Sequence, residues 1–164
     1  MLSLFYHIRC FIIKHTTAKK YYRYMPVTEH IGQELSKGRT TRVGCMLLST
    51  DRSTRSIGYN GAPRRCNADE DGDWRREKPE KYWWMAHAEM NAITNAARCG
   101  TPIENCIAVV THLPCMDCAK ALAQSGIRMV ICKQPTDRYI ETWGADIART
   151  KILFKEIGIP LIII

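Results

Sequence analysis

The second half of the chain alternates short apolar runs with amphipathic segments, and this pattern limits the possible folds more than any other feature. The apolar runs predict three strands, at 106–111, 129–132 and 161–164. The amphipathic segments predict three helices, at 86–98, 114–125 and 145–156. A glycine such as Gly126 follows each predicted helix, and glycine commonly ends helices. Strands that alternate with helices form partly or wholly parallel sheets covered by helices, so we expect an α/β fold.

The first half adds a helix and a hairpin to this pattern. Val27, Ile31 and Leu35 recur at four-residue spacing after Pro26, which predicts an amphipathic helix that ends near Gly38. Two further strands joined by a turn are predicted, at 43–50 and 56–59. We therefore expect a three-layer α/β/α sandwich with a central, mixed, five-stranded sheet.

The chain of 164 residues corresponds to one domain, which we place at 26–164 after an N-terminal extension at 1–25. The extension ends in a basic and aromatic run at 19–24. This run is either an arm that touches a phosphate or, as we favour, a tail that is solvated or packed on a partner. Residues 60–84 are predicted to be irregular and too long for an ordinary connection, and such loops often carry function.

The charge of the chain favours an anionic partner. Its 24 lysine and arginine residues outnumber 16 aspartate and glutamate residues, which gives a net charge of +8. A nucleotide, a nucleic acid or a membrane surface would each fit this charge. No apolar stretch approaches the ~20 residues that span a membrane. The apolar N-terminus is interrupted by charged residues, which is not typical of a signal peptide.

The eight cysteines do not have the pattern of a disulfide framework. Only Cys115 and Cys118 are close in the sequence, and the others are scattered. A C-x-x-C pair in a chain of this length indicates metal or redox chemistry in a reducing compartment. We therefore expect a cytoplasmic protein that does not act on a membrane.

Two short segments, His87-Ala88-Glu89 and Pro114-Cys115-Met116-Asp117-Cys118, each begin a predicted helix. The two cysteines lie on one helical face, and the positive end of the helix dipole favours their thiolate forms, which bind metals. His87 at the start of the preceding helix can supply a third ligand. One histidine and two cysteines make a zinc site with an open fourth position for water, as in catalytic zinc sites.

Glu89 follows His87 by two residues, so we expect its carboxylate near the open position without being a ligand. A carboxylate there can take a proton from water and pass it to a substrate nitrogen, which describes hydrolytic deamination of an amidine-like base. The alternatives are a structural zinc ribbon or a redox pair for the cysteines, a capping role for His87 and a helix-dipole role for Glu89. A ribbon would need a second C-x-x-C pair, which the sequence lacks.

The H-x-E and P-C-x-x-C segments together are the signature of zinc-dependent nucleobase deaminases. Residues 36–157 resemble the deoxycytidylate (dCMP) deaminases within the cytidine and deoxycytidylate deaminase superfamily. The matching segments are G-Y-N-G-A-P at 58–63, H-A-E-M-N-A-I at 87–93, P-C-M-D-C-A-K at 114–120 and Q-S-G-I at 124–127. The long segment before His87 also fits, because tRNA adenosine deaminases have a much shorter loop there. Free-nucleoside cytidine deaminases have a cysteine in place of the histidine ligand.

The resemblance implies a cytidine deaminase-like fold and the conversion of dCMP to dUMP and ammonia, which feeds dTMP synthesis. It implies that His87, Cys115 and Cys118 bind Zn²⁺ and that Glu89 carries protons. It implies that the Ala88 backbone binds the cytosine carbonyl and that the Leu113 carbonyl meets the leaving amine. It further implies that Asn60 contacts the deoxyribose and that Tyr139 stacks on the base. Thr41 and Arg42 would bind the phosphate. Asn60 can also be read as a turn residue, Tyr139 as a core aromatic and Arg42 as a solvated charge.

The family is typically hexameric, activated by dCTP with Mg²⁺ and inhibited by dTTP. Its allosteric motif matches Gly58, Tyr59, Asn60 and Gly61. The glycines in this motif would let a nucleotide approach the backbone closely. The alternative is a simple turn at the end of a hairpin. The resemblance therefore implies a homohexamer with nucleotide effectors and disfavours a nucleic-acid partner. The rival functions are a dCMP/dCTP deaminase, a tRNA adenosine deaminase and a non-catalytic zinc-binding interaction domain.

Overall fold

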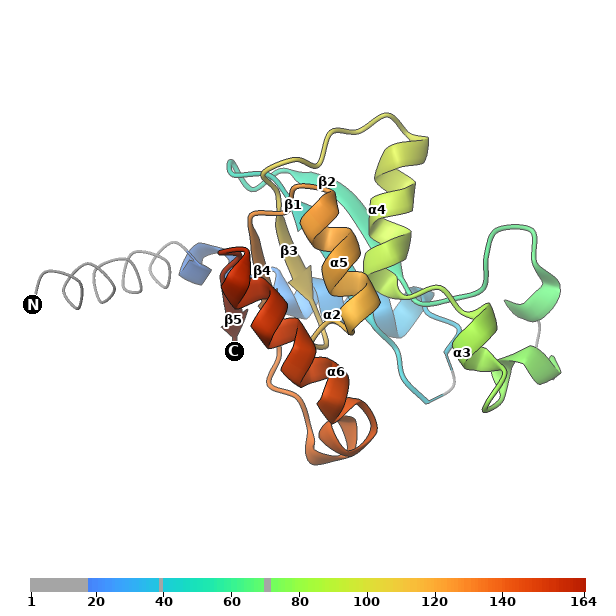
Figure 1. Cartoon of the computed structure of the whole chain (residues 1–164). Coiled ribbons are helices and arrows are strands. Elements are labelled where there is room, and N and C mark those ends of the chain that lie inside the picture. Colours follow the sequence, from blue (N-terminus) through green and yellow to red (C-terminus); the bar gives the residue numbers. More distant parts are fainter. Residues whose placement is uncertain (1–17, 39, 70–71) are drawn as a thin grey trace, which may run out of the picture.

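The computed structural model describes residues 18–38, 40–69 and 72–164 (Figure 1). Its centre is a five-stranded sheet in the order β2-β1-β3-β4-β5. The strands are β1 (Gly44–Leu48), β2 (Thr54–Tyr59), β3 (Ile107–Val110), β4 (Met129–Cys132) and β5 (Leu161–Ile163). Strand β1 is antiparallel to β2 and β3, whereas β3, β4 and β5 are parallel to one another. The predicted mixed sheet is confirmed.

Helices cover both faces of this sheet, which confirms the three-layer sandwich. The long helices are α2 (Met25–Leu35), α4 (Ala88–Arg98), α5 (Met116–Gln124) and α6 (Asp137–Glu156). In Figure 1, α4, α5 and α6 lie in front of the sheet and α2 lies behind it. Every residue of β1, β3 and β4 is buried, which explains why these strands are continuous apolar runs in the sequence.

Alternate side chains of the central strands form two cores. Cys45, Ala108 and Val130 belong to the core beneath α4, α5 and α6. Met46, Val109 and Ile131 belong to the core on the α2 side. The sheet therefore holds α4 and α5 at a fixed distance from each other on one face, and the beginnings of these two helices carry the candidate site.

Helix α2 exists as predicted, but of its predicted apolar stripe only Ile31 packs against the core. Val27 is 48% exposed and Leu35 is 43% exposed, whereas Thr28 and Gly32 are buried. The reason is close backbone contact, since a Cβ atom at Gly44 of β1 would lie 2.0 Å from the Thr28 carbonyl oxygen. The small residues of the helix face the sheet because larger ones would not fit.

Helix α6 begins at Asp137, eight residues before the predicted start at Ala145. Thr136 is its N-cap, and its hydroxyl accepts a hydrogen bond from the Tyr139 amide at 3.3 Å. This helix therefore includes Tyr139 and Trp143 in its first turns.

The described part of the predicted N-terminal extension packs against the sheet. Residues 18–22 are helical, and Ala18, Tyr21 and Met25 are buried in the core on the α2 side. The Tyr21 hydroxyl donates a hydrogen bond of 3.2 Å to the Thr50 carbonyl oxygen. Residues 1–17 lie outside the described residues, and the domain boundary at residue 26 stays a prediction.

Residues 62–69 and 72–84, which lie between β2 and α4 in the chain, form an insert that extends from the sandwich (Figure 1). It contains two short 3₁₀ turns, η1 (Asn67–Asp69) and η2 (Trp74–Arg76), and the short helix α3 (Lys81–Trp84). No helix in the described part of the chain is both long and apolar enough to cross a membrane.

Candidate metal and catalytic site

The structure brings the three predicted metal ligands together. His87 is the N-cap of α4, Cys115 is the N-cap of α5, and Cys118 lies in the first turn of α5. The His87 Nδ1 atom lies 3.3 Å from the Cys115 Sγ atom and 3.5 Å from the Cys118 Sγ atom. These three atoms all lie within 4.8 Å of one another. We call these three residues the ligand cluster.

The ligand cluster has the dimensions of a zinc site. Zinc binds histidine nitrogen at about 2.0–2.1 Å and cysteine sulfur at about 2.3 Å, so tetrahedral geometry separates the two atoms by about 3.6 Å. The observed separations of 3.3 and 3.5 Å are close to that value. The seven described cysteines are all free, so neither Cys115 nor Cys118 is tied up in a disulfide and both sulfurs are available as metal ligands. The donor set and its spacing both fit zinc.

The environment of the cluster favours a thiolate at Cys115. Hydrogen bonds from Cys118 and His87 lower the pKa of the Cys115 thiol, and the start of α5 adds the positive end of the helix dipole. His87 makes no side-chain capping bond to α4 among the described residues. His87 thus occupies the N-cap position with its backbone, while its side chain is directed at the two cysteines and not at the helix amides.

Glu89 lies in the first turn of α4, two residues after His87, and is only 4% exposed. Burial raises the pKa of its carboxyl group. A raised carboxyl pKa suits a group that must both accept and release a proton near neutral pH. Its predicted role in proton transfer stays a prediction.

The backbone just before Cys115 is held by two side chains of α6. The Tyr139 hydroxyl donates a hydrogen bond of 2.7 Å to the Leu113 carbonyl oxygen. The Thr150 hydroxyl donates one of 3.1 Å to the Pro114 carbonyl oxygen. Burial raises the pKa of the Tyr139 hydroxyl, so it remains a donor at neutral pH. The Leu113 carbonyl oxygen keeps a second lone pair, and its predicted contact with the leaving amine stays a prediction.

Trp143 is a neighbour of the cluster that sequence reasoning missed. Its ring meets the His87 ring edge-on, with centroids 6.3 Å apart and an interplanar angle of 89°. It also meets the ring of Tyr82 on α3 at 5.9 Å and that of Tyr139 at 6.4 Å. Trp143 therefore joins the insert to the ligand cluster. Trp143 follows Tyr139 by four residues, so a helix that begins after the Thr136 cap places both rings on the same face. The N-cap threonine is the sequence signal that indicates this helix start.

Asn60 lies at the end of β2 and organises the loop that follows α2. Its Oδ1 atom accepts hydrogen bonds from the Ser36 hydroxyl at 2.7 Å and from the Val43 amide at 2.6 Å. Its Nδ2 atom donates one of 3.0 Å to the Thr41 carbonyl oxygen. These partners give Asn60 a structural role, and its predicted contact with deoxyribose stays a prediction.

Thr41 and Arg42 are exposed, but the Arg42 guanidinium is directed at the backbone. It donates hydrogen bonds to the carbonyl oxygens of Gln33 at 2.8 Å and Gly38 at 3.3 Å. Their predicted phosphate contact stays a prediction.

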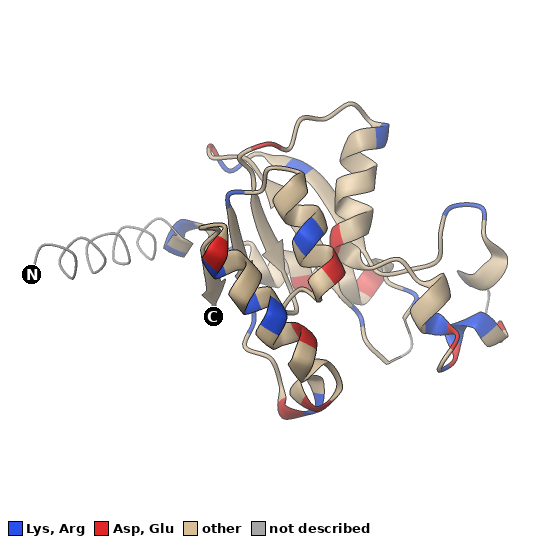
Figure 2. Ribbon diagram, in the orientation of Figure 1, with Lys and Arg blue, Asp and Glu red and all other residues tan. Residues whose placement is uncertain are grey.

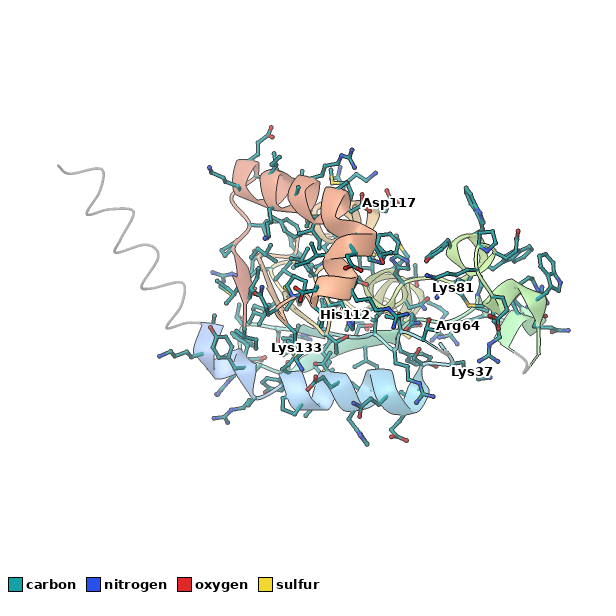
Figure 3. The ribbon with its side chains drawn as sticks, turned by 90° about the horizontal axis from the view of Figure 1, so that it is seen from below. Lys37, Arg64, Lys81, His112, Asp117 and Lys133 are labelled. Carbon is teal, nitrogen blue, oxygen red and sulfur yellow. The ribbon has the colours of Figure 1, made fainter. Side chains whose placement is uncertain are left out.

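Other cations lie near the loop that carries Thr41. Lys81 of the insert reaches this loop through a 2.9 Å bond from its Nζ atom to the Thr40 hydroxyl. Figure 3 shows Lys37, Arg64 and Lys81 on the insert side of His112, and Figure 2 shows further basic residues on the insert itself.

The G-Y-N-G segment at 58–61 is largely occupied by contacts within the fold. A Cβ atom at Gly58 would lie 2.2 Å from the Ala88 carbonyl oxygen and 2.3 Å from the Ala92 amide nitrogen, so Gly58 is required by the packing of α4. Gly61 exchanges backbone hydrogen bonds of 3.1 and 2.9 Å with Ala86. Tyr59 is 37% exposed. The predicted nucleotide contact at this segment stays a prediction.

Comparisons with known proteins identify the family. The sequence model described as the cytidine and deoxycytidylate deaminase zinc-binding region matches residues 18–134. The chain is 34% identical to an uncharacterized deaminase in the luxG 3′ region of Aliivibrio fischeri, over 85% of this chain and 89% of that protein. It is 33% identical to deoxycytidylate deaminase of Homo sapiens, over 83% of this chain and 75% of that protein.

A solved structure with the same fold is the dCMP deaminase of the cyanophage S-TIM5 in complex with dCMP and dUMP. It has a TM-score of 0.67 and 23% sequence identity, over 89% of this chain and 97% of that one. The family match spans both the His87 and the P-C-x-x-C segments. The resemblance expected from the sequence is thereby confirmed, and the chain belongs to the cytidine and deoxycytidylate deaminase family.

Proposed function

We propose that this protein is a zinc-dependent dCMP deaminase that converts dCMP and water to dUMP and ammonia. The observation that carries the proposal is the ligand cluster of His87, Cys115 and Cys118 with the buried Glu89 beside it. The identity of 33% to a human deoxycytidylate deaminase supports dCMP as the substrate.

In this proposal His87, Cys115 and Cys118 hold the zinc ion. A bound zinc ion supplies a Lewis acid that makes water a nucleophile near neutral pH. The Glu89 carboxylate accepts the proton of the attacking water and delivers it to the ring nitrogen next to C4. The water oxygen forms a bond to C4, its remaining proton moves to the exocyclic amine, the C4–N bond breaks, and ammonia departs to leave a carbonyl at C4.

The surroundings of Glu89 would orient the base. In this proposal the Ala88 backbone holds the cytosine carbonyl, and the free lone pair of the Leu113 carbonyl oxygen accepts from the amine. The Tyr139 ring forms a flat wall for the base, supported by His112, whose ring centroid lies 5.2 Å away.

The sugar and the phosphate would bind where β2, the loop after α2 and the insert meet. Asn60 has one amide hydrogen left for the deoxyribose after its bond to Thr41. Thr41, Arg42 and the nearby Lys81 supply donors for the phosphate, with Lys81 already placed by its bond to Thr40.

We further propose that the enzyme is a homohexamer, activated by dCTP with Mg²⁺ and inhibited by dTTP at residues 58–61. The exposed Tyr59 ring offers a surface for a nucleotide base there. The free cysteines support a reducing, cytoplasmic location, where dUMP would feed dTMP synthesis.

The test is ammonia release by the zinc-loaded protein offered dCMP, dCTP and deoxycytidine in parallel, with and without dTTP. Turnover of dCMP alone, suppressed by dTTP, supports both the reaction and its regulation. Equal turnover of dCTP would establish the bifunctional alternative. No turnover of any of the three would overturn the proposal, and RNA substrates or a non-catalytic zinc module would then be tested.

A further inference from the structure

Helix α6 presents four side chains on one face toward the ligand cluster and the strand ends beside it. Tyr139, Trp143, Ile147 and Thr150 follow one another at intervals of three or four residues, which places them on one stripe of the helix. Three of the four contact a ligand residue or the backbone next to one. Figure 1 shows that α6 runs beside α5, the helix that carries both cysteines.

Thr150 acts on the cysteine half of the cluster. Its side chain is fully buried, and its hydroxyl donates to the Pro114 carbonyl oxygen at 3.1 Å. Pro114 directly precedes Cys115, the N-cap of α5, so this carbonyl lies outside the hydrogen-bond ladder of the helix. A buried hydroxyl is costly unless it is bonded, so packing alone would favour alanine or valine at this position.

Trp143 acts on the histidine half of the cluster. Its ring stands perpendicular to the His87 imidazole, and this edge-on contact restricts rotation of the imidazole about its side-chain bonds. Because Nδ1 is the atom that faces both sulfurs, the ring plane decides whether that nitrogen points into the cluster.

We propose that Thr150 and Trp143 are positioning residues that hold the ligand cluster at metal-binding geometry from one helix face. Thr150 fixes the backbone that presents Cys115, and Trp143 fixes the ring plane of His87. This inference rests on the proposed function in one respect, namely that the cluster holds zinc. Residues that orient metal ligands change metal affinity about 10- to 100-fold when they are removed.

The first experiment measures zinc release from the fully loaded protein to an excess of a chromogenic chelator. Thr150→Val removes the hydroxyl at nearly constant volume, and we expect zinc release about tenfold faster than from the wild type. Thr150→Ser keeps the hydroxyl, so we expect this variant to release zinc as slowly as the wild type. Thr142→Val is the matched control, since the Thr142 hydroxyl is exposed and bonds only within its own helix, to the Arg138 carbonyl oxygen at 3.1 Å.

The second experiment tests Trp143 by the absorption spectrum of the cobalt-substituted protein. Trp143→Phe is expected to shift the cobalt bands, because the orientation of His87 changes, and to speed zinc release. Trp83→Phe is the control, because Trp83 is 83% exposed on α3. A residue with only a packing role would lower the unfolding midpoint and leave the cobalt spectrum unchanged.

If Thr150→Val releases zinc at the wild-type rate, the positioning role of Thr150 is overturned. If the cobalt spectrum of Trp143→Phe is unchanged, the positioning role of Trp143 is overturned. If Thr150→Val does not fold, Thr150→Ala is compared with Thr150→Ser, because only the alanine variant loses the hydroxyl bond to the Pro114 carbonyl oxygen and should release zinc faster. Wild-type protein that takes up no zinc would overturn the proposed function itself and this inference with it. That result differs from a failure of the positioning roles alone, because it is seen in the wild type before any residue is changed.

Discussion

The Tyr139 hydroxyl donates a hydrogen bond of 2.7 Å to the Leu113 carbonyl oxygen, so one side chain both lines the candidate site and holds the backbone beside Cys115. The ring and the hydroxyl of Tyr139 thus have separable roles. The ring is the proposed wall for the base, and the hydroxyl fixes the carbonyl that is proposed to meet the leaving amine.

Tyr139→Phe and Tyr139→Ala should therefore differ in substrate binding. Phenylalanine loses the hydrogen bond but keeps the wall, so we expect a loss of about 1 kcal/mol in unfolding free energy and a nearly unchanged KM for dCMP. Alanine also loses base stacking, worth about 1–3 kcal/mol, so KM should rise at least about fivefold. Steady-state kinetics with dCMP measures both variants, and an equal KM for the two would show that the ring is not the wall.

Asn60→Ala should destabilise the fold because Asn60 has three partners in a separate loop. The Val43 amide and the Ser36 hydroxyl would lose the Oδ1 acceptor, and the Thr41 carbonyl oxygen would lose its Nδ2 donor. We expect the free energy of unfolding to fall by about 2–3 kcal/mol, measured by chemical denaturation. Asn91→Ala is the control with one comparable bond, from Nδ2 to the Tyr59 carbonyl oxygen at 2.8 Å, and should cost about 1 kcal/mol.

Two glycine-to-alanine changes should have opposite effects on stability. Gly58→Ala forces a Cβ atom to within 2.2 Å of the Ala88 carbonyl oxygen, so it should destabilise by at least about 1–3 kcal/mol. Gly144→Ala lies inside α6, where the nearest atom is Ile140 Cγ2 at 3.8 Å, and should stabilise by about 0.5–1 kcal/mol. Thermal unfolding of both variants is the measurement. A tolerated Gly58→Ala would mean that the packing of α4 does not explain this glycine.

Zinc content should depend on Cys115 and not on cysteine in general. Cys115→Ser removes a thiolate ligand from the cluster, so the purified variant should contain little zinc and unfold at a lower temperature. Cys99→Ser changes an exposed cysteine at the end of α4 and should keep wild-type zinc content. Metal analysis by mass spectrometry compares the two, and full zinc occupancy in Cys115→Ser would contradict the assigned ligand set.

The parts of the fold predicted best are those determined by local pattern. Strand β4 has the predicted bounds, 129–132, because a fully buried parallel strand is an uninterrupted apolar run. The ligand cluster is likewise encoded by two short motifs, each at the start of a helix that the shared sheet holds in place.

The remaining features depend on contacts between distant segments. The buried face of α2 is decided by the close approach of Gly44 to Thr28, which a helical stripe does not reveal. Asn60 reads as a turn residue, and its partners Ser36 and Val43 precede it by many residues. The position of Trp143 does not follow from the sequence pattern, because the apolar periodicity predicts a helix only from Ala145, whereas α6 begins at Asp137.

If Glu89 carries protons at a zinc site that deaminates dCMP, removal of its carboxylate should stop turnover without releasing the metal. Zinc content and dUMP formation are measured together for the wild type and Glu89→Gln, a change that keeps the size of the side chain but removes its carboxylate. We expect equal zinc content and a rate of dUMP formation about 10²- to 10⁴-fold lower in the variant. A variant that keeps its zinc and forms dUMP at the wild-type rate would contradict the account.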